Sequence, residues 1–187
     1  MLKRIFDILI SALLSLILAP LLAACALAVA VSSSGPVLFK SLRVGRGGVA
    51  FSMLKFRTMC DGTPQVATHL LANAANFITP VGRFLRRTSL DELPQLWNVL
   101  RGEMSLVGPR PALLDQEDLL ELRRRSGADT LRPGISGWAQ VRGRDELSVQ
   151  EKAALDGEYL QKQSFLFDLW ILILTVGKVL KSEGIQH

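Results

Sequence analysis

An uncharged apolar run of 24 residues, Ile8–Val31, limits what this chain can fold into. The run is long enough for a helix that crosses a bilayer. Pro20 lies near its middle, and because proline has no N–H and its ring clashes with the preceding turn, a helix bends or breaks there. Basic residues stand on both sides of the run, which favours two ends on the same membrane face. These flanking cations are Lys3 and Arg4 before the run, and Lys40, Arg43 and Arg46 after it.

Three alternatives for this segment stay open on its local features. The first is a straight transmembrane helix, and the second is a re-entrant helix that enters the membrane and returns to the same face. The third is a secretory signal, because the basic start, the apolar run and Leu22-Ala23-Ala24-Cys25 are similar to a lipoprotein cleavage site. The decision between them depends on the rest of the chain.

The charge balance indicates an anionic partner. The 187 residues carry a net charge of +5 and have a pI near 9.6, which fits a membrane surface, a nucleotide phosphate or nucleic acid. A nucleic-acid-binding protein does not account for the apolar segment, so we expect no nucleic-acid partner. The two cysteines, Cys25 and Cys60, give neither a disulfide framework nor zinc-ligand spacing, which favours a reduced, cytoplasmic setting.

The residues beyond 35 predict a small β-hairpin followed by several helices. Strand-like stretches over 37–44 and 49–55 flank a glycine-rich turn. Ser89 is expected to be the N-cap of a helix from Leu90 to Leu100 that stops at Gly102, with Glu92 as its capping-box partner. Further helices are expected over 79–87, 116–125 and 149–163, an extended loop over 109–111, and a loop or short strand over 132–137.

The segment 165–180 predicts a helix with an apolar face. The run is too short for a second span, and Trp170 inside it and lysines at its end suit a helix that lies in a membrane interface. A buried core helix fits this segment equally well.

Asp91 and Glu92 form the only adjacent acidic pair in the stretch 83–111, which also holds five arginines. Adjacent helical side chains point about 100° apart, so the two carboxylates suit different tasks, for instance attack on phosphorus and metal binding. Spacing alone nevertheless favours helix-dipole complementation and capping over catalysis. Arg110 lies between two prolines, a rigid setting for a guanidinium that binds phosphate or pairs with a nearby carboxylate.

The residue types present argue against several other chemistries. His69 and His187 are the only histidines, which makes Ser-His-Asp and Cys-His catalysis implausible. The glycine-rich stretch 132–137 lacks the spacing of dinucleotide-binding and P-loop motifs, so neither fold is expected.

Four stretches of the chain, taken together, resemble one protein family. They are KFRTM at 55–59, TSLDELPQLWNVLRGEMS at 88–105, VGPRP at 107–111 and RPGISGWAQVRGR at 132–144. In this order they are similar to the small monotopic phosphoglycosyltransferases, the bacterial sugar transferases that initiate surface-glycan and glycoprotein assembly. The similarity extends over nearly the whole chain.

The resemblance implies an enzyme that transfers a sugar-1-phosphate from a UDP-sugar to undecaprenyl phosphate and releases UMP. It implies that Asp91 attacks the phosphate attached to the sugar, that the polyprenyl phosphate resolves the covalent intermediate, and that Glu92 binds Mg²⁺. Because both substrates are anionic, a metal and arginines are needed to offset phosphate charge. By the same resemblance Lys55, Arg86, Arg110 and Arg144 are expected to bind phosphate or uridine, and Asp156 to lie near the active site.

The resemblance also decides between the three alternatives for the N-terminal segment. Family members have a re-entrant helix broken at a Ser-Pro step, which here is Ala19-Pro20. We therefore expect an α+β, predominantly helical monotopic membrane protein with a re-entrant membrane helix over 1–34. A cytoplasmic catalytic domain with interfacial amphipathic helices and the small β-hairpin is expected over 35–187. UDP-sugars are cytoplasmic, so this domain is expected on the cytoplasmic face of the bacterial inner membrane, in contact with membrane lipids.

Overall fold

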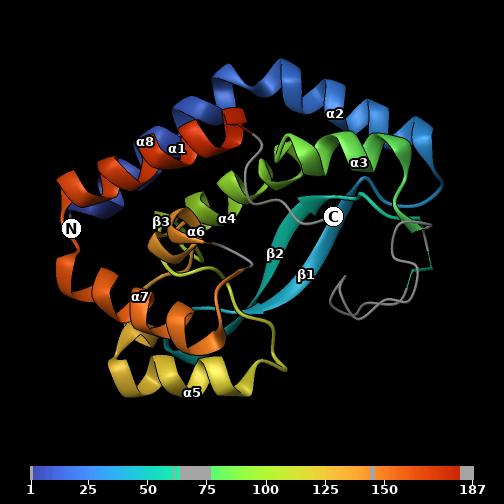
Figure 1. Ribbon diagram of the computed structural model, residues 1–187. Coiled ribbons are helices and arrows are strands. Elements are labelled where there is room, and N and C mark those ends of the chain that lie inside the picture. Colours follow the sequence, from blue (N-terminus) through green and yellow to red (C-terminus); the bar gives the residue numbers. More distant parts are fainter. Residues whose placement is uncertain (1, 61, 64–76, 144–145, 182–187) are drawn as a thin grey trace.

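The apolar run forms two helices, α1 (Leu2–Ile17) and α2 (Ala19–Ser32), which meet at a bend of 64°. The computed structural model describes residues 2–60, 62–63, 77–143 and 146–181 (Figure 1). Pro20 lies in the first turn of α2, where its missing N–H removes no helical hydrogen bond. No single helix of the described chain is long and apolar enough to cross a membrane, whereas α1 and α2 meet that criterion as a bent pair.

The predicted β-hairpin is confirmed. Strands β1 (Leu38–Val44) and β2 (Ala50–Phe56) pair antiparallel and are joined by the short 3₁₀ turn η1 (Arg46–Gly48). Gly47 has a φ of 64° in this turn, a conformation that glycine adopts without steric cost. Ser41 is buried while its neighbours along β1 are exposed, so one face of the hairpin packs against the rest of the protein.

The predicted helix from Leu90 to Leu100 is wrong at its beginning. Residues Leu90–Glu92 form a 3₁₀ turn, η4, and the α-helix α4 covers only Gln95–Arg101. An α-helix that began at Leu90 would need the N–H of residue 94 to donate to the Leu90 carbonyl, and Pro94 has none. The chain therefore makes two short turns instead of one continuous helix.

The predicted capping box is also wrong, whereas the predicted helix end is confirmed. Ser89 has a left-handed backbone (φ 56°) and its side chain caps nothing. The carboxylate of Glu92 accepts a hydrogen bond from Lys55 instead. Gly102 ends α4 with the left-handed conformation that commonly closes a helix.

A second, parallel pair of strands was not predicted. β3 (Ser105–Val107) pairs with β4 (Gly134–Ser136) from a distant part of the chain. The backbones approach so closely that a Cβ on Gly134 would lie 2.1 Å from the nitrogen of Gly108. Glycine is required at this crossing, which explains part of the glycine content of 132–137.

The remaining helices complete an α+β, predominantly helical fold. They are α3 (Pro80–Arg87), α5 (Glu117–Ser126), the 3₁₀ turn η5 (Ala128–Thr130), α6 (Trp138–Arg142), α7 (Val149–Lys162) and α8 (Phe165–Lys181). Helices α3, α5, α7 and α8 agree with predicted helices, whereas α6 and the 3₁₀ turn η5 were not predicted. Helices α5 and α7 lie side by side at the end of the molecule away from α2 (Figure 1). The core lies between the hairpin, α4, β3 and α8, and includes Val99, Met104 and Tyr159.

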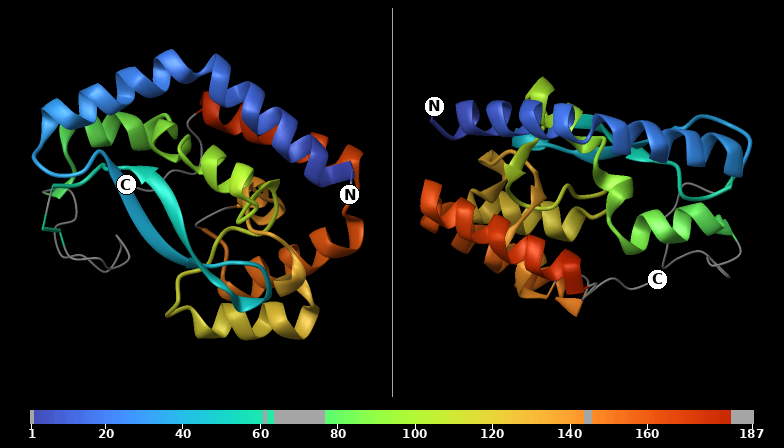
Figure 2. Two further views of the ribbon diagram at one scale, coloured as in Figure 1. Left: turned by 180° about the vertical axis from the view of Figure 1, so that it is seen from behind. Right: turned by 90° about the horizontal axis from the view of Figure 1, so that it is seen from above.

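Helices α1 and α8 touch at their N-terminal ends. The Lys3 Nζ atom lies 2.7 Å from Asp168 Oδ2, and the rings of Phe6 and Phe165 meet edge to face with centroids 5.1 Å apart. Figure 1 superposes the two helices, whereas the view from above separates them (Figure 2). The ends of the two helices are therefore pinned together while their axes diverge.

Helix α8 is buried on one side only. Ile171 is completely buried, whereas Leu166 and Trp170 are 75% and 52% exposed. The helix is thus a core helix on one face and presents an apolar surface on the other. Its location in a membrane interface stays a prediction.

Candidate active site

Asp91 and Glu92 lie on η4, between α3 and α4, against strand β2. Asn98 fixes this arrangement, because its side chain joins α4 to the edge of β2. The Leu54 N–H donates to Asn98 Oδ1 over 3.0 Å, and Asn98 Nδ2 donates to the Ser52 carbonyl over 2.8 Å. The amide is completely buried, so these bonds are made in a setting of low dielectric where they are strong and specific.

The structure brings four of the predicted site residues together in a charged row, composed of Asp91, Lys55, Glu92 and Arg110. Lys55 Nζ lies 2.7 Å from Glu92 Oε1 and 4.0 Å from Asp91 Oδ2. On the other side of Glu92, the Arg110 Nη2 atom lies 3.6 Å from the same Oε1. Carboxylates and cations thus alternate in the order Asp91, Lys55, Glu92 and Arg110.

Arg86 lies at the edge of the charged row. Its Nε donates to Thr58 Oγ1 over 2.9 Å, and its charge acts on Asp91. Burial lowers the pKa of Arg86, and the neighbouring charge of Asp91 raises it. Arg144, another predicted phosphate- or uridine-binding residue, lies outside the described residues.

Asp156 is not among the residues of the charged row. Its carboxylate is buried on α7 and accepts from Arg123 of α5, with Nη2 and Oδ2 2.7 Å apart. Burial raises the pKa of Asp156, and the Arg123 guanidinium opposes that shift. This ion pair assigns Asp156 to the α5–α7 contact, and a role in substrate binding stays a prediction.

Asp91 is 7% exposed and has an unusual titration. Burial raises its pKa to about 6, the Lys55 and Arg86 cations lower it, and the Glu92 charge raises it. A carboxyl group with this pKa is largely ionised at neutral pH but more basic than an exposed aspartate. Such a shift is frequent at catalytic sites.

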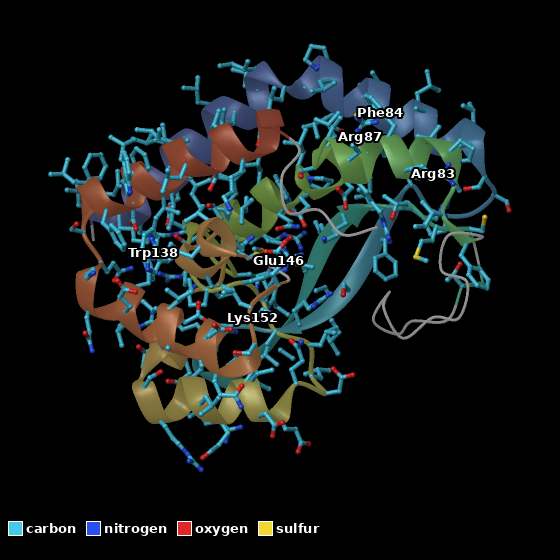
Figure 3. All side chains as sticks on the ribbon, viewed as in Figure 1. Arg83, Phe84, Arg87, Trp138, Glu146 and Lys152 are labelled. Atoms are coloured by element: carbon cyan, nitrogen blue, oxygen red, sulfur yellow. The ribbon has the colours of Figure 1, made fainter. Side chains whose placement is uncertain are left out.

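An apolar groove of about 760 Å³ opens beside the charged row. It lies between the diverging parts of α1 and α8, and Glu92 contributes to its wall. Other lining residues are Leu14 of α1, Leu18 between α1 and α2, Leu93 next to η4, and Leu172 and Val176 of α8. Glu146 lines it from the segment before α7 (Figure 3). The groove therefore connects a charged site with a surface of aliphatic side chains.

Arg43 was predicted only to be one of the basic residues that flank the apolar run. The structure places it near the charged row. The charges of Arg110 and Glu92 both act on the Arg43 guanidinium, the first lowering and the second raising its pKa. The strand pattern could have predicted this position. Arg43 and Phe39 are four residues apart, so they point to the same side of a predicted strand, and the partner strand carries Lys55.

The donor set of the site fits a magnesium ion that is shared with a substrate. The described residues contain no cluster of three or more His, Cys, Asp or Glu side chains, so no all-protein metal cage is present in that part of the chain. Mg²⁺ commonly uses one or two carboxylates and takes its other ligands from water and substrate phosphates. Asp91 and Glu92 supply two carboxylates beside cations that suit phosphate.

Fold and site together define a small α+β protein in which a row of paired carboxylates and basic side chains meets an apolar groove. The profile of one family, described as bacterial sugar transferase, matches residues 1–182. The chain therefore belongs to the bacterial sugar transferase family.

Individual relatives are similar over nearly the whole chain. An uncharacterized sugar transferase, EpsL, of Bacillus subtilis is 42% identical over 100% of this chain and 91% of its own length. The UDP-glucose:undecaprenyl-phosphate glucose-1-phosphate transferase of Caulobacter vibrioides is 44% identical over 97% of this chain and 71% of its own. A UDP-N-acetylgalactosamine-undecaprenyl-phosphate N-acetylgalactosaminephosphotransferase of Aeromonas hydrophila is 37% identical over 97% of this chain and 44% of its own.

Proposed function

We propose that this protein transfers a sugar-1-phosphate from a UDP-sugar to undecaprenyl phosphate, giving undecaprenyl-diphospho-sugar and UMP. Two named relatives carry out reactions of this kind with different sugars, according to their names. The observation that carries the proposal is the charged row beside the apolar groove, in which Asp91 is a buried carboxylate 4.0 Å from Lys55 and its neighbour Glu92 lines the groove. A soluble anionic donor suits the row, and an acceptor with a long hydrocarbon chain suits the groove.

In the first step, a carboxylate oxygen of Asp91 forms a bond to the phosphorus that carries the sugar. The bond from that phosphorus to the oxygen bridging the two phosphates breaks, and UMP leaves with the bridging oxygen and its electron pair. Asp91 then holds the sugar phosphate as an acyl phosphate. Lys55 and Arg110 are positioned to offset the negative charge that this step concentrates on phosphate oxygens.

In the second step, a phosphate oxygen of undecaprenyl phosphate forms a bond to the same phosphorus. The bond between phosphorus and Asp91 breaks, the carboxylate is restored, and the lipid diphospho-sugar is the product. One carboxylate therefore serves both substrates in turn.

Glu92 is expected to hold Mg²⁺ together with donor phosphate oxygens. The ion, when bound, would neutralise phosphate charge and orient the diphosphate. Glu92 accepts from Lys55 over 2.7 Å, so metal binding would redirect Lys55 toward the phosphates or toward Asp91. Chelation of Mg²⁺ is expected to abolish UMP release, and added Mg²⁺ to restore it.

The test is UMP release from a panel of UDP-sugars with undecaprenyl phosphate and Mg²⁺. Asp91→Asn is expected to lower the rate by roughly three orders of magnitude or more, because it removes the nucleophile. Asp118→Asn, on the exposed face of α5, is the matched control and should keep the wild-type rate. With the UDP-sugar alone, intact-protein mass spectrometry should detect a sugar-phosphate adduct on the wild type. Activity that survives in Asp91→Asn would exclude Asp91 as the nucleophile.

We further propose that the protein is monotopic in the bacterial cytoplasmic membrane, with α1 and α2 forming the re-entrant helix. Exposed apolar side chains on α1, α3 and α8 support this location, and α3 adds Arg83 and Arg87 beside the exposed ring of Phe84 (Figure 3). An apolar side chain flanked by arginines suits an anionic lipid surface.

Membrane topology can be tested with single cysteines in intact cells and inverted vesicles. In a Cys60→Ser background, cysteines at Lys3 and Ser34 should both react with an impermeant reagent only from the cytoplasmic side. Labelling of either position from outside the cell would contradict the re-entrant path and indicate a straight span.

A further inference from the structure

Arg43 lies on the same face of the hairpin as Lys55. In the antiparallel register, Arg43 is opposite Phe51, Ser41 is opposite Met53, and Phe39 is opposite Lys55. Paired residues point to the same side of a sheet, and positions two apart along one strand share a face. The basic side chain of β1 and that of β2 are therefore directed to the same side, toward Glu92.

The Arg43 guanidinium is anchored on one edge and available on the other. Its Nε donates to Ser41 Oγ over 3.0 Å, and its Nη1 lies 3.5 Å from the Pro111 carbonyl, next to Arg110 in sequence. The structure records no hydrogen bond from the Nη2 group to any described residue. Two N–H groups in a fixed plane thus remain for a ligand.

Arg43 extends the charged row at the end away from Asp91. Burial and the nearby charge of Arg110 lower the pKa of Arg43 to about 10, and the charges of Glu92 and Asp115 oppose that shift. Two guanidinium groups are thus held near one another in a partly buried place. The nearby carboxylates offset only part of the cost of holding these two cations there, and an anion between the two guanidinium groups would offset more of it.

We infer that Arg43 binds the phosphate of the UMP half of the donor, together with Arg110, and so stabilises the leaving group. This assignment rests on the proposed function. Under the proposed function, the phosphorus under attack lies next to Asp91. The second phosphate of the donor then lies on the opposite side of that phosphorus, away from Asp91. Arg110 and Arg43 form the end of the charged row that is away from Asp91, so we place the second phosphate there. Negative charge grows on that phosphate as its bond to the sugar phosphate breaks, where a planar guanidinium gives two-pronged hydrogen bonding.

A positioning role through the Pro111 carbonyl is the competing explanation, and UMP binding separates the two. Dissociation constants of UMP and of uridine are measured directly on the purified wild type in nanodiscs, on Arg43→Ala and on Arg43→Lys. Lys40→Ala is the matched control, because it removes a cation from the exposed face of the same strand. Thermal unfolding midpoints report whether each variant is folded.

Arg43→Ala is expected to weaken UMP binding by roughly 10- to 100-fold, as for loss of a charge-assisted hydrogen bond, and to leave uridine binding unchanged. Arg43→Lys should retain part of the UMP affinity, because it keeps the charge and loses the planar fork. It also serves as the test if Arg43→Ala does not fold. The KM for the UDP-sugar should rise in both variants while the KM for undecaprenyl phosphate stays constant.

Two results would overturn the inference while leaving the proposed function intact. One is UMP affinity equal to wild type in both variants, and the other is an equal loss for UMP and uridine, which would indicate a displaced loop. A wild-type protein that releases no UMP from any UDP-sugar would overturn the proposed function and this inference with it.

Discussion

Replacing Lys55 with methionine should move the pH dependence of the reaction to higher pH. The Lys55 ammonium lies 4.0 Å from Asp91 in a largely buried place and favours the ionised carboxylate. An opposite charge at this distance typically lowers a carboxyl pKa by about 1–3 units. The pKa of Asp91, about 6 in the wild type, is therefore expected to rise to about 7–9 in Lys55→Met.

The sign follows from the role of Asp91 as a nucleophile, which requires the ionised form. In the wild type, kcat/KM for the UDP-sugar should rise with pH, pass its midpoint near 6 and become constant above about 7.5. At pH 7 the ionised fraction of Asp91 would fall from about 90% to about 50% or less in the variant. Loss of phosphate binding by Lys55 lowers the rate at every pH, so it changes the height of the curve and not its midpoint.

The assay is UMP release at low UDP-sugar concentration between pH 5 and 9, at constant Mg²⁺ and ionic strength. Lys40→Met removes the same charge from the exposed face of β1 and should keep the midpoint near 6. A Lys55→Met curve with its midpoint still near 6 would refute the reasoning, because either Lys55 does not hold Asp91 ionised or another group controls the reaction.

Three further predictions concern stability. Because the folded-state pKa of Asp91 is raised, its ionisation opposes folding above about pH 6, and this effect disappears as the pH falls toward 3.8. Asp91→Asn should therefore stabilise the protein by about 1–3 kcal/mol at pH 8 and by little at pH 4. Denaturant unfolding in detergent measures this difference. Asn98→Ala leaves the Leu54 N–H unpaired in the interior and should lower the free energy of unfolding by about 2–4 kcal/mol in the same assay, whereas a change below about 0.5 kcal/mol would contradict the buried bridge. Gly82→Ala would place a Cβ 2.0 Å from the Thr58 carbonyl oxygen, so we expect a loss above about 3 kcal/mol, and a wild-type thermal midpoint would show that the contact relaxes freely.

Local elements were predictable from the sequence where one residue type decides the backbone. The glycine-rich turn at 45–48 predicted the hairpin, and Gly102 predicted the end of α4, because both need conformations that other residues avoid. Pro94 carried enough information to correct the helix beginning at Leu90, since an α-helix there needs a missing N–H.

Contacts between distant segments were not predictable in this way. Strands β3 and β4 have three residues each and lie far apart in sequence, so neither alternation nor length distinguishes them from loops. The Asp156–Arg123 pair likewise depends on how α5 packs on α7. Register, by contrast, follows from the hairpin once its turn is known, and it is register that directs Arg43 and Lys55 to the same side.

The polar contacts of α1 fix how this helix lies against the rest of the protein. Asp7 is buried and accepts from Ser105 Oγ over 2.8 Å and from the Leu106 N–H over 3.2 Å, while Lys3 pairs with Asp168. Such contacts on an otherwise apolar helix fix one register against the catalytic part, because any shift would leave a buried carboxylate without partners. The groove lies between this helix and α8, and Glu92 contributes to its wall. Burial raises the pKa of Asp91, and its neighbour Glu92 lines the apolar groove, so a lipid acceptor could approach the site along this groove under the proposed mechanism.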